Sequence, residues 1–155
     1  MSMSPITFLG SSALSDFRRK ALVKKLNVKD IRARWVHYVA LHGGNRPVDF
    51  DQSDLKQMLT YGEEYLEDEE DEETTTTWFI QPRQGTISPW SSKATSIVEA
   101  CGLGDYVKRV ERGMEIKIKF DGDFDVDKAK RELHDPMTQD LTNSIPDLEI
   151  MFGEQ

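Results

Sequence analysis

The order of apolar and polar residues is most regular at 114–120, where Met, Ile, Ile and Phe alternate with Glu, Lys and Lys. A period of two residues predicts a strand with one buried face. Runs rich in β-branched and aromatic residues predict further strands at 6–9, 31–41, 74–80 and 106–110. Glu111, Arg112 and Gly113 separate the last two of these strands, and a hairpin connection is expected there.

Apolar residues spaced by three or four positions predict helices between the strands. The first helix carries Leu14 to Leu26; we expect a serine cap at Ser11 or Ser12 and an end at Asn27. A short helix is predicted to open at Asp51 or Ser53 and to end near Gly62. A final helix over 126–133 should stop before Pro136, and the tail residues 148–152 suggest a short strand.

The stretch Gln81–Thr95, QPRQGTISPWSSKAT, contains the start of a further helix. Ser88 suits the N-cap position and Pro89 the first helical position. From there Trp90, Ala94, Ile97, Val98 and Cys101 form one apolar stripe, while the hydroxyl residues and Lys93 lie on another face. Gly102 is expected to close the helix in a left-handed conformation. Mixed helices and strands with an antiparallel pair near the end predict an α+β fold, with helices on one face of a mostly antiparallel sheet.

The net charge of −8 comes from a single segment of the 155 residues. Nine of the eleven residues in Glu63–Glu73 are acidic, and outside this segment 19 acidic residues balance 20 basic ones. Such a dense block of like charge is expected to form a solvated loop, and a partner-binding segment is the alternative. The chain has no basic stripe, so we expect no nucleic acid partner, and no membrane segment, so we expect a cytoplasmic protein.

The residues suggest no catalytic centre. The stretch lacks the G-x-x-x-x-G-K-[ST] phosphate loop, and the chain lacks the G-x-S-x-G nucleophile elbow and the common metal-binding motifs. Cys101 lies on the apolar stripe, where a buried thiol would be inert. The spacing of His37, His42 and His134 implies no catalytic triad. Anion binding at the start of the helix, helped by Arg83 and Lys93, remains an alternative because helix N-termini attract anions.

Six blocks, in order along the chain, carry a resemblance to a known family. They are GSSALSDFR at 10–18, WVHY at 35–38, LTYG at 59–62, GTISPWSSKAT at 85–95, RVERG at 109–113 and ELHD at 132–135. Together they resemble the N-terminal domain of the large, single-chain form of phosphoribosylformylglycinamidine synthase (FGAM synthase). The chain departs from that pattern at Gln84, at Ser96, at Pro136 and in the acidic segment, which looks like an insertion.

The resemblance implies a parent enzyme that converts formylglycinamide ribonucleotide to the amidine with ATP, magnesium and glutamine. The ATP, the magnesium and the catalytic residues would belong to synthetase and glutaminase domains elsewhere in the parent chain. This chain would then hold no cofactor, no metal and no catalytic residue. It would act as a scaffold for those two domains and for the path of ammonia between them.

The resemblance also implies a domain similar to a dimer of the small PurS subunit. We expect a PurS-like domain over 1–140, with halves of about 1–73 and 74–152, followed at 141–155 by a linker or terminal strand. The expected contacts with the other domains are Arg83, Ser91, Ser92, Lys93 and Thr95. The alternatives are a free-standing PurS-like adaptor and an anion-binding module.

Overall fold

The computed structural model of the chain describes residues 6–41, 59, 65, 74–83, 87–104, 106–146 and 148–152. Apart from Leu59 and Tyr65, the helix expected before Gly62 and the acidic segment Glu63–Glu73 lie outside the described residues. Within the described part, no helix has both the length and the apolar character that crossing a membrane requires.

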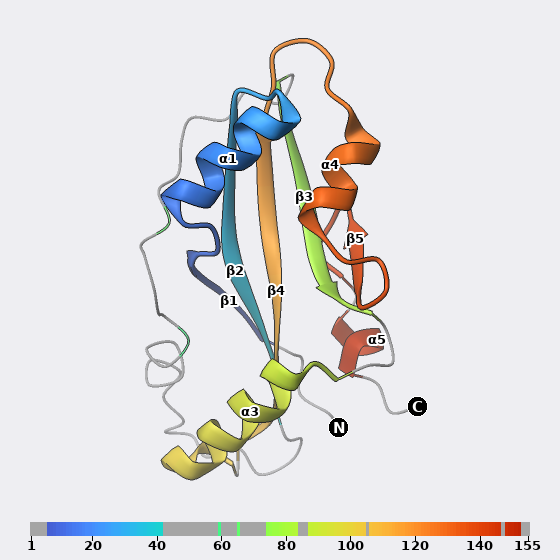
Figure 1. The fold of residues 1–155 in the computed structure, drawn as a ribbon. Helices are drawn as coiled ribbons and strands as arrows, with labels where there is room; N and C mark the ends of the chain where they lie inside the picture. Colours follow the sequence, from blue (N-terminus) through green and yellow to red (C-terminus); the bar gives the residue numbers. More distant parts are fainter. Residues whose placement is uncertain are drawn as a thin grey trace.

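Five strands form one sheet, in which every neighbouring pair is antiparallel. The order across the sheet is β1-β2-β4-β3-β5 (Figure 1). The strands are β1 (Ile6–Ser12), β2 (Asp30–Leu41), β3 (Thr75–Pro82), β4 (Val107–Lys119) and β5 (Gln139–Thr142). The predicted α+β class with a mostly antiparallel sheet is confirmed.

Three helices pack on one face of this sheet (Figure 1). They are α1 (Asp16–Leu26), α3 (Pro89–Val98) and α4 (Val126–Leu133). Helices α1 and α4 cover one end of the face, and α3 crosses the other end (Figure 1). The order strand, helix, strand therefore occurs twice, as β1-α1-β2 and as β3-α3-β4, and the last strands of the two units, β2 and β4, pair at the centre. The predicted domain boundaries stay a prediction.

Two apolar clusters bury this face, one at each end. The first joins α1 and α4 to the sheet through Leu22, Leu26, Ile31, Ala33, Trp78, Ile80, Ile116, Ile118 and Ala129. The second lies under α3 and contains Val39, Leu41, Leu59, Val98, Val107 and Val110. The central part of the face, between the clusters, is where the candidate site lies.

The ends of α1 are set by local capping. Ser15, rather than Ser11 or Ser12, is the N-cap, and its hydroxyl accepts a hydrogen bond from the amide of Arg18. Ser12 lies in β1 instead, and its hydroxyl donates to the carbonyl of Leu14. Asn27 closes the helix with a φ of 54°, as expected, because asparagine tolerates the left-handed conformation.

The hairpin expected at Glu111–Gly113 is wrong. Residues 107–119 form one uninterrupted strand, paired with β2 from Asp30 opposite Lys119 to Leu41 opposite Val107. The glycine serves close packing instead of a turn. A Cβ on Gly113 would lie 2.6 Å from the carbonyl oxygen of Ile80 and 3.0 Å from the ring of Tyr38.

The strand expected at 148–152 is also wrong. Residues Leu148–Phe152 form the short helix α5, and the terminal strand is β5, at 139–142. The sequence Leu-Glu-Ile-Met-Phe is apolar enough to suit either structure, and runs this short are ambiguous by periodicity. The guanidinium of Arg109 contacts this helix, 5.3 Å from the Phe152 ring and 3.4 Å from the carbonyl oxygen of Met151.

Candidate functional site at the split between β3 and β4

The site begins where β3 leaves β4. The two strands pair as far as Ile80, which lies opposite Met114. Beyond that point β3 continues beside β5, with Pro82 opposite Gln139. The edge of β4 from 107 to 113 therefore needs other partners for its backbone groups, and the first turns of α3 supply them.

Two hydroxyl groups of α3 attach the helix to this edge. The Ser91 hydroxyl donates to the carbonyl oxygen of Val110, and the Val110 amide donates to the Thr95 hydroxyl at 3.2 Å. Ser91 is completely buried. The two hydroxyls thus bond to backbone groups of β4 that a neighbouring strand would otherwise bond. We had expected both side chains to contact other domains.

A buried carboxylate joins the same helix to the middle of β4. Glu111 has no exposed surface. It accepts hydrogen bonds from the Ser88 hydroxyl at 2.7 Å, from Arg109 Nη2 at 2.9 Å and from the backbone amide of Arg112 at 3.0 Å. The Ser88 hydroxyl also accepts a bond from the Ser91 amide, so it caps α3 as predicted. The buried carboxylate is therefore satisfied by one cation and several hydrogen-bond donors.

Glu111 also bears on the alternative of anion binding at this helix. Its Oε2 lies 3.4 Å from the backbone nitrogen of Ser88, at the positive end of α3. The chain thus places its own carboxylate where an external anion would bind. This arrangement disfavours the anion-binding alternative.

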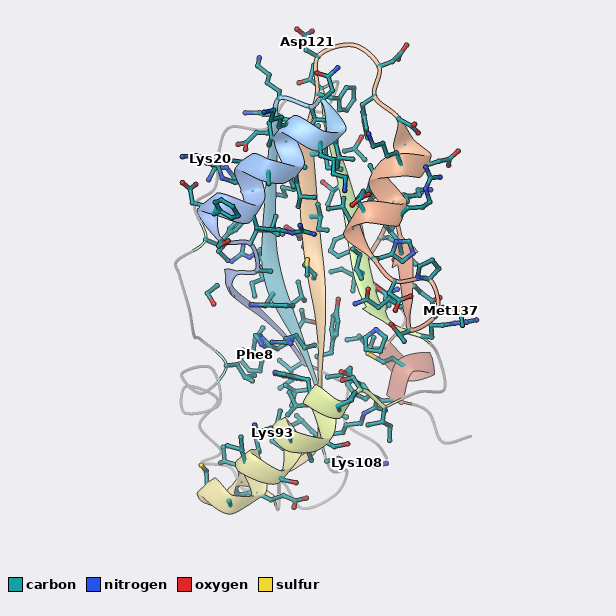
Figure 2. The ribbon with its side chains drawn as sticks, in the orientation of Figure 1. Phe8, Lys20, Lys93, Lys108, Asp121 and Met137 are labelled. Atoms are coloured by element: carbon teal, nitrogen blue, oxygen red, sulfur yellow. The ribbon has the colours of Figure 1, made fainter. Side chains whose placement is uncertain are left out.

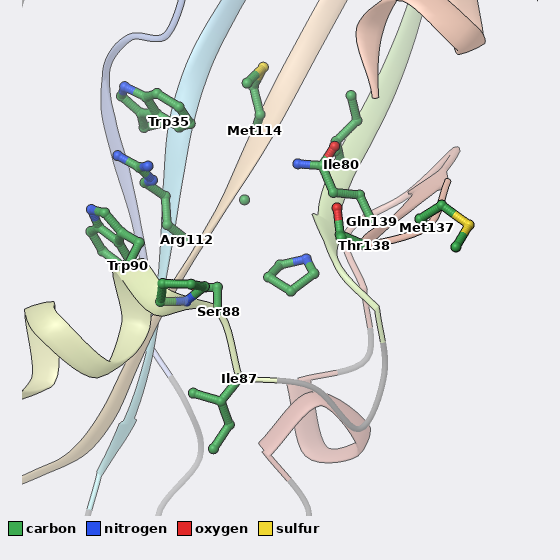
Figure 3. A pocket seen from close by; sticks show the side chains of 13 residues that line it. Trp35, Ile80, Ile87, Ser88, Trp90, Arg112, Met114, Met137, Thr138 and Gln139 are labelled. Atoms are coloured by element: carbon green, nitrogen blue, oxygen red, sulfur yellow. The ribbon is translucent and has the colours of Figure 1, made fainter. Parts of the chain in front are cut away.

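An arginine lies between two tryptophans on one wall of the site. The Arg112 guanidinium carbon is 3.9 Å from the ring centroid of Trp35 and 4.6 Å from that of Trp90. Figure 3 shows the guanidinium between the two indole rings. Contacts with both rings restrict the position of the guanidinium.

His37 lies next to this stack. Its ring centroid is 5.6 Å from that of Trp90, and its side chain is completely buried. Burial, and secondarily the charge of Arg112, lowers the pKa of His37 to about 4. The imidazole is therefore neutral at pH 7. Gly10 makes room for it, because a Cβ there would lie 2.9 Å from His37 Cε1.

A hollow of about 450 Å³ opens between these elements (Figure 3). Trp35, Trp90 and Arg112 form one wall, and Ile80, Thr138 and Gln139 form the opposite wall. The remaining lining residues are Pro82, Ile87, Ser88, Pro89, Gly113, Met114 and Met137. Ile87 and Met137 are large apolar side chains that stay 62% and 80% exposed at its rim.

The other predicted contact residues are on the surface. Ser92 and Lys93 are exposed on α3 (Lys93 is labelled in Figure 2). Arg83 is exposed after β3, and its backbone amide donates to the carbonyl oxygen of Thr138 at 3.0 Å. The predicted role of all five residues in contacts between domains stays a prediction.

Our expectation for Cys101 is wrong, because its thiol is exposed. α3 ends at Val98, and residues Glu99–Leu103 form a wider π-helical turn. Cys101 lines a hollow together with Ala94 and Val98, and this side of the helix is open to solvent, since Ile97 is also 50% exposed. Gly102 has the expected left-handed conformation, with a φ of 88°.

His37 and His134 do not meet the described acidic residues in a metal-binding group. Among the described residues, no three His, Cys, Asp or Glu side chains lie close enough to hold a metal ion. His134 instead lies at the end of α4, where its Nδ1 contacts the carbonyl oxygen of Lys130. His42 lies outside the described residues.

A comparison with known protein families matches residues 34–152 to the family described as formylglycinamide ribonucleotide amidotransferase N-terminal. The chain belongs to this family. The amidotransferase, also called FGAM synthase, is an enzyme of purine biosynthesis. The match contains every residue that lines the hollow, whereas β1 and α1 precede it.

Sequence reasoning missed the centre of this amidotransferase domain. The block RVERG at 109–113 was visible, but the hairpin interpretation hid the role of Glu111 and Arg112. The missed signal is the alternation of Val110, Arg112 and Met114, which continues the period of the following strand without a break. Trp35 could have been linked to Arg112 only through the pairing of β2 with β4.

Proposed function

We propose that this chain is the non-catalytic N-terminal domain of a formylglycinamide ribonucleotide amidotransferase. The observation that carries the proposal is the family match over residues 34–152. The parent enzyme would form formylglycinamidine ribonucleotide in the cytoplasm with ATP, magnesium and glutamine. Synthetase and glutaminase domains of the same parent chain would hold the ATP, the magnesium and the catalytic residues, and this chain would hold none of them.

The role that we propose for the domain is to hold those two domains in register along the path of ammonia. A scaffold needs a rigid body with accessible side chains on its surface. Here Glu111 and the Ser91 and Thr95 hydroxyls attach α3 to the sheet. The same helix presents Ser92 and Lys93 outward. Because α3 is fixed to the sheet, a contact made by these exposed side chains would also fix the position of the sheet relative to the partner domain.

The first test is activity of the purified chain of 155 residues. Supplied with glutamine, ATP, magnesium and formylglycinamide ribonucleotide, it should form no amidine. Amidine production above a boiled-protein control would contradict the proposed scaffold role.

A second test uses the full parent protein and separates scaffolding from chemistry. Lys93→Glu reverses a charge on the exposed face of α3, and Lys24→Glu changes an exposed lysine on α1 as the matched control. We expect Lys93→Glu to raise the number of glutamine molecules hydrolysed per amidine formed, while activity with free ammonia is retained. If the ratio of glutamine hydrolysed to amidine formed is unchanged in both variants, the proposed contact of this helix is contradicted.

A further inference from the structure

The hollow between β3, β4 and α3 has the composition of a protein interface. Its lining includes Trp35, Trp90, Met114, Met137 and Arg112. Tryptophan, methionine and arginine are the residue types enriched at the centres of interfaces. The exposed side chains at the rim, Ile87 and Met137, extend this apolar surface outward. Apolar surface of this kind on a single domain marks an interaction site.

The shape of the hollow favours a protein segment over a small molecule. A small-molecule site encloses most of its ligand's surface. Here two of the large apolar lining residues remain more than half exposed, so a small ligand would leave them in water. A segment of another protein domain would cover the hollow and its rim together.

The charge of the hollow indicates one property of that segment. Among the described residues that line it, Arg112 is the charged one. Behind it, the Glu111 carboxylate is paired with Arg109 at 2.9 Å. The planar guanidinium, held by Trp35 and Trp90, has five N–H donors and so can serve more than one acceptor. A carboxylate is the complementary group.

We propose that this hollow is the docking site for a segment of another domain of the parent enzyme, and that the segment carries a large apolar side chain next to an aspartate or glutamate. The apolar side chain packs between the tryptophan wall and the β3–β5 wall, and the carboxylate lies toward Arg112. This inference rests on the proposed function and specifies where one of the proposed contacts is made.

The experiment places a photo-crosslinking residue, p-benzoylphenylalanine, at Met137 in the full parent protein. Met137 is 80% exposed, so the substitution leaves the core untouched, and Phe17, 85% exposed on α1, is the matched control position. After irradiation we expect position 137 to crosslink to a peptide outside residues 1–155 that has an apolar residue within about two positions of an acidic one. Position 17 should give no crosslink to that peptide.

The charge of the partner is tested with a second residue of the rim. With the crosslinker at Ile87, Met137→Glu should lower the yield of the same crosslink about fivefold, since like charges repel, whereas Met137→Lys should change it less than about twofold. Equal losses in both variants would overturn the acidic character of the segment.

Other outcomes overturn the docking site itself. These are crosslinks from position 137 only within residues 1–155, crosslinks only to a second copy of the chain, and no crosslink. A crosslinker at Lys93 separates this inference from the proposed function. If position 93 reaches another domain and position 137 does not, the hollow is excluded and the scaffold role stands. If neither position reaches another domain, both proposals fail.

Discussion

The hydroxyl of Ser88 donates a 2.7 Å hydrogen bond to the carboxylate of Glu111, and this bond joins the first turn of α3 to the middle of β4. The carboxylate is completely buried, so the energetic consequences of losing it should be large. Several measurable properties of the chain depend on this junction and on the packing around it.

Removal of the Glu111 carboxylate should destabilise the chain strongly. In Glu111→Ala, the guanidinium of Arg109, 19% exposed, loses its partner at 2.9 Å. We expect the free energy of unfolding to fall by about 3 kcal/mol, because the guanidinium loses a buried ionic partner and the Ser88 hydroxyl loses its acceptor. Glu111→Gln keeps the shape and an acceptor oxygen and should lose less. Urea denaturation followed by circular dichroism measures both, and equal losses would show that charge pairing is unimportant here.

Loss of the Ser88 hydroxyl removes the N-cap of α3 and the bond to Glu111 together. Ser88→Ala should lower the free energy of unfolding by about 1–2 kcal/mol. Ser92→Ala, an exposed serine on the same helix, is the control and should stay within about 0.5 kcal/mol of the parent. A double-mutant cycle of Ser88→Ala with Glu111→Gln should show coupling between the two side chains. Strict additivity would argue against the bond.

Gly113 should not tolerate a side chain. In Gly113→Ala the new Cβ would lie 2.6 Å from the carbonyl oxygen of Ile80, which is backbone and cannot move aside cheaply. We expect a loss of about 2 kcal/mol or more. Gly102→Ala is the comparison, because its Cβ meets nothing within 4 Å and only the φ of 88° is strained. Its expected loss is about 1 kcal/mol. A smaller loss at 113 than at 102 would contradict the close packing.

The stability of the chain should depend on pH through His37. Burial, with help from Arg112, lowers the pKa of the folded imidazole from 6.5 to about 4. The unfolded chain therefore binds the extra proton first, and stability is full above about pH 6.5 and falls as the pH drops toward 4. The expected loss over this window is about 3 kcal/mol, from about 1.4 kcal/mol per pKa unit.

His37→Gln provides the control for that pH dependence, because it removes the titrating ring and leaves His134 and the carboxylates unchanged. Urea denaturation at a series of pH values should show a flatter curve for the variant between pH 4 and 6.5. Parallel curves for the two proteins would mean that His37 does not carry the dependence.

Local patterns were sufficient for much of the fold. The alternation at 114–120, the β-branched run at 75–80 and the helical spacing of 126–133 all appear in the structure as predicted. Asn27 and Ser88 also have their predicted end positions, because caps depend on neighbouring backbone groups alone. Gly102 has its predicted left-handed conformation, although α3 ends earlier, at Val98.

Local patterns did not predict the role of a residue where that role depends on contacts with residues far away in the sequence. Gly113 looks like a turn residue, but its small size is required by Ile80 and Tyr38, which come from two other strands. Ser91 and Thr95 look like surface polar residues, yet they bond to the backbone of Val110. The helical stripe likewise placed Cys101 inside, whereas its thiol is exposed in the structure.

The sequence alone determined the fold class, the family resemblance and most of the elements, because these depend on periodicity, capping and recurring blocks of residues. The tertiary structure alone decided that β3 leaves β4 at Met114, that Glu111 anchors α3, and that Arg112 lies between Trp35 and Trp90. These relationships join residues from separate strands and a helix. They arise from strand register and packing, to which every segment contributes at once, so no local stretch of sequence contains them.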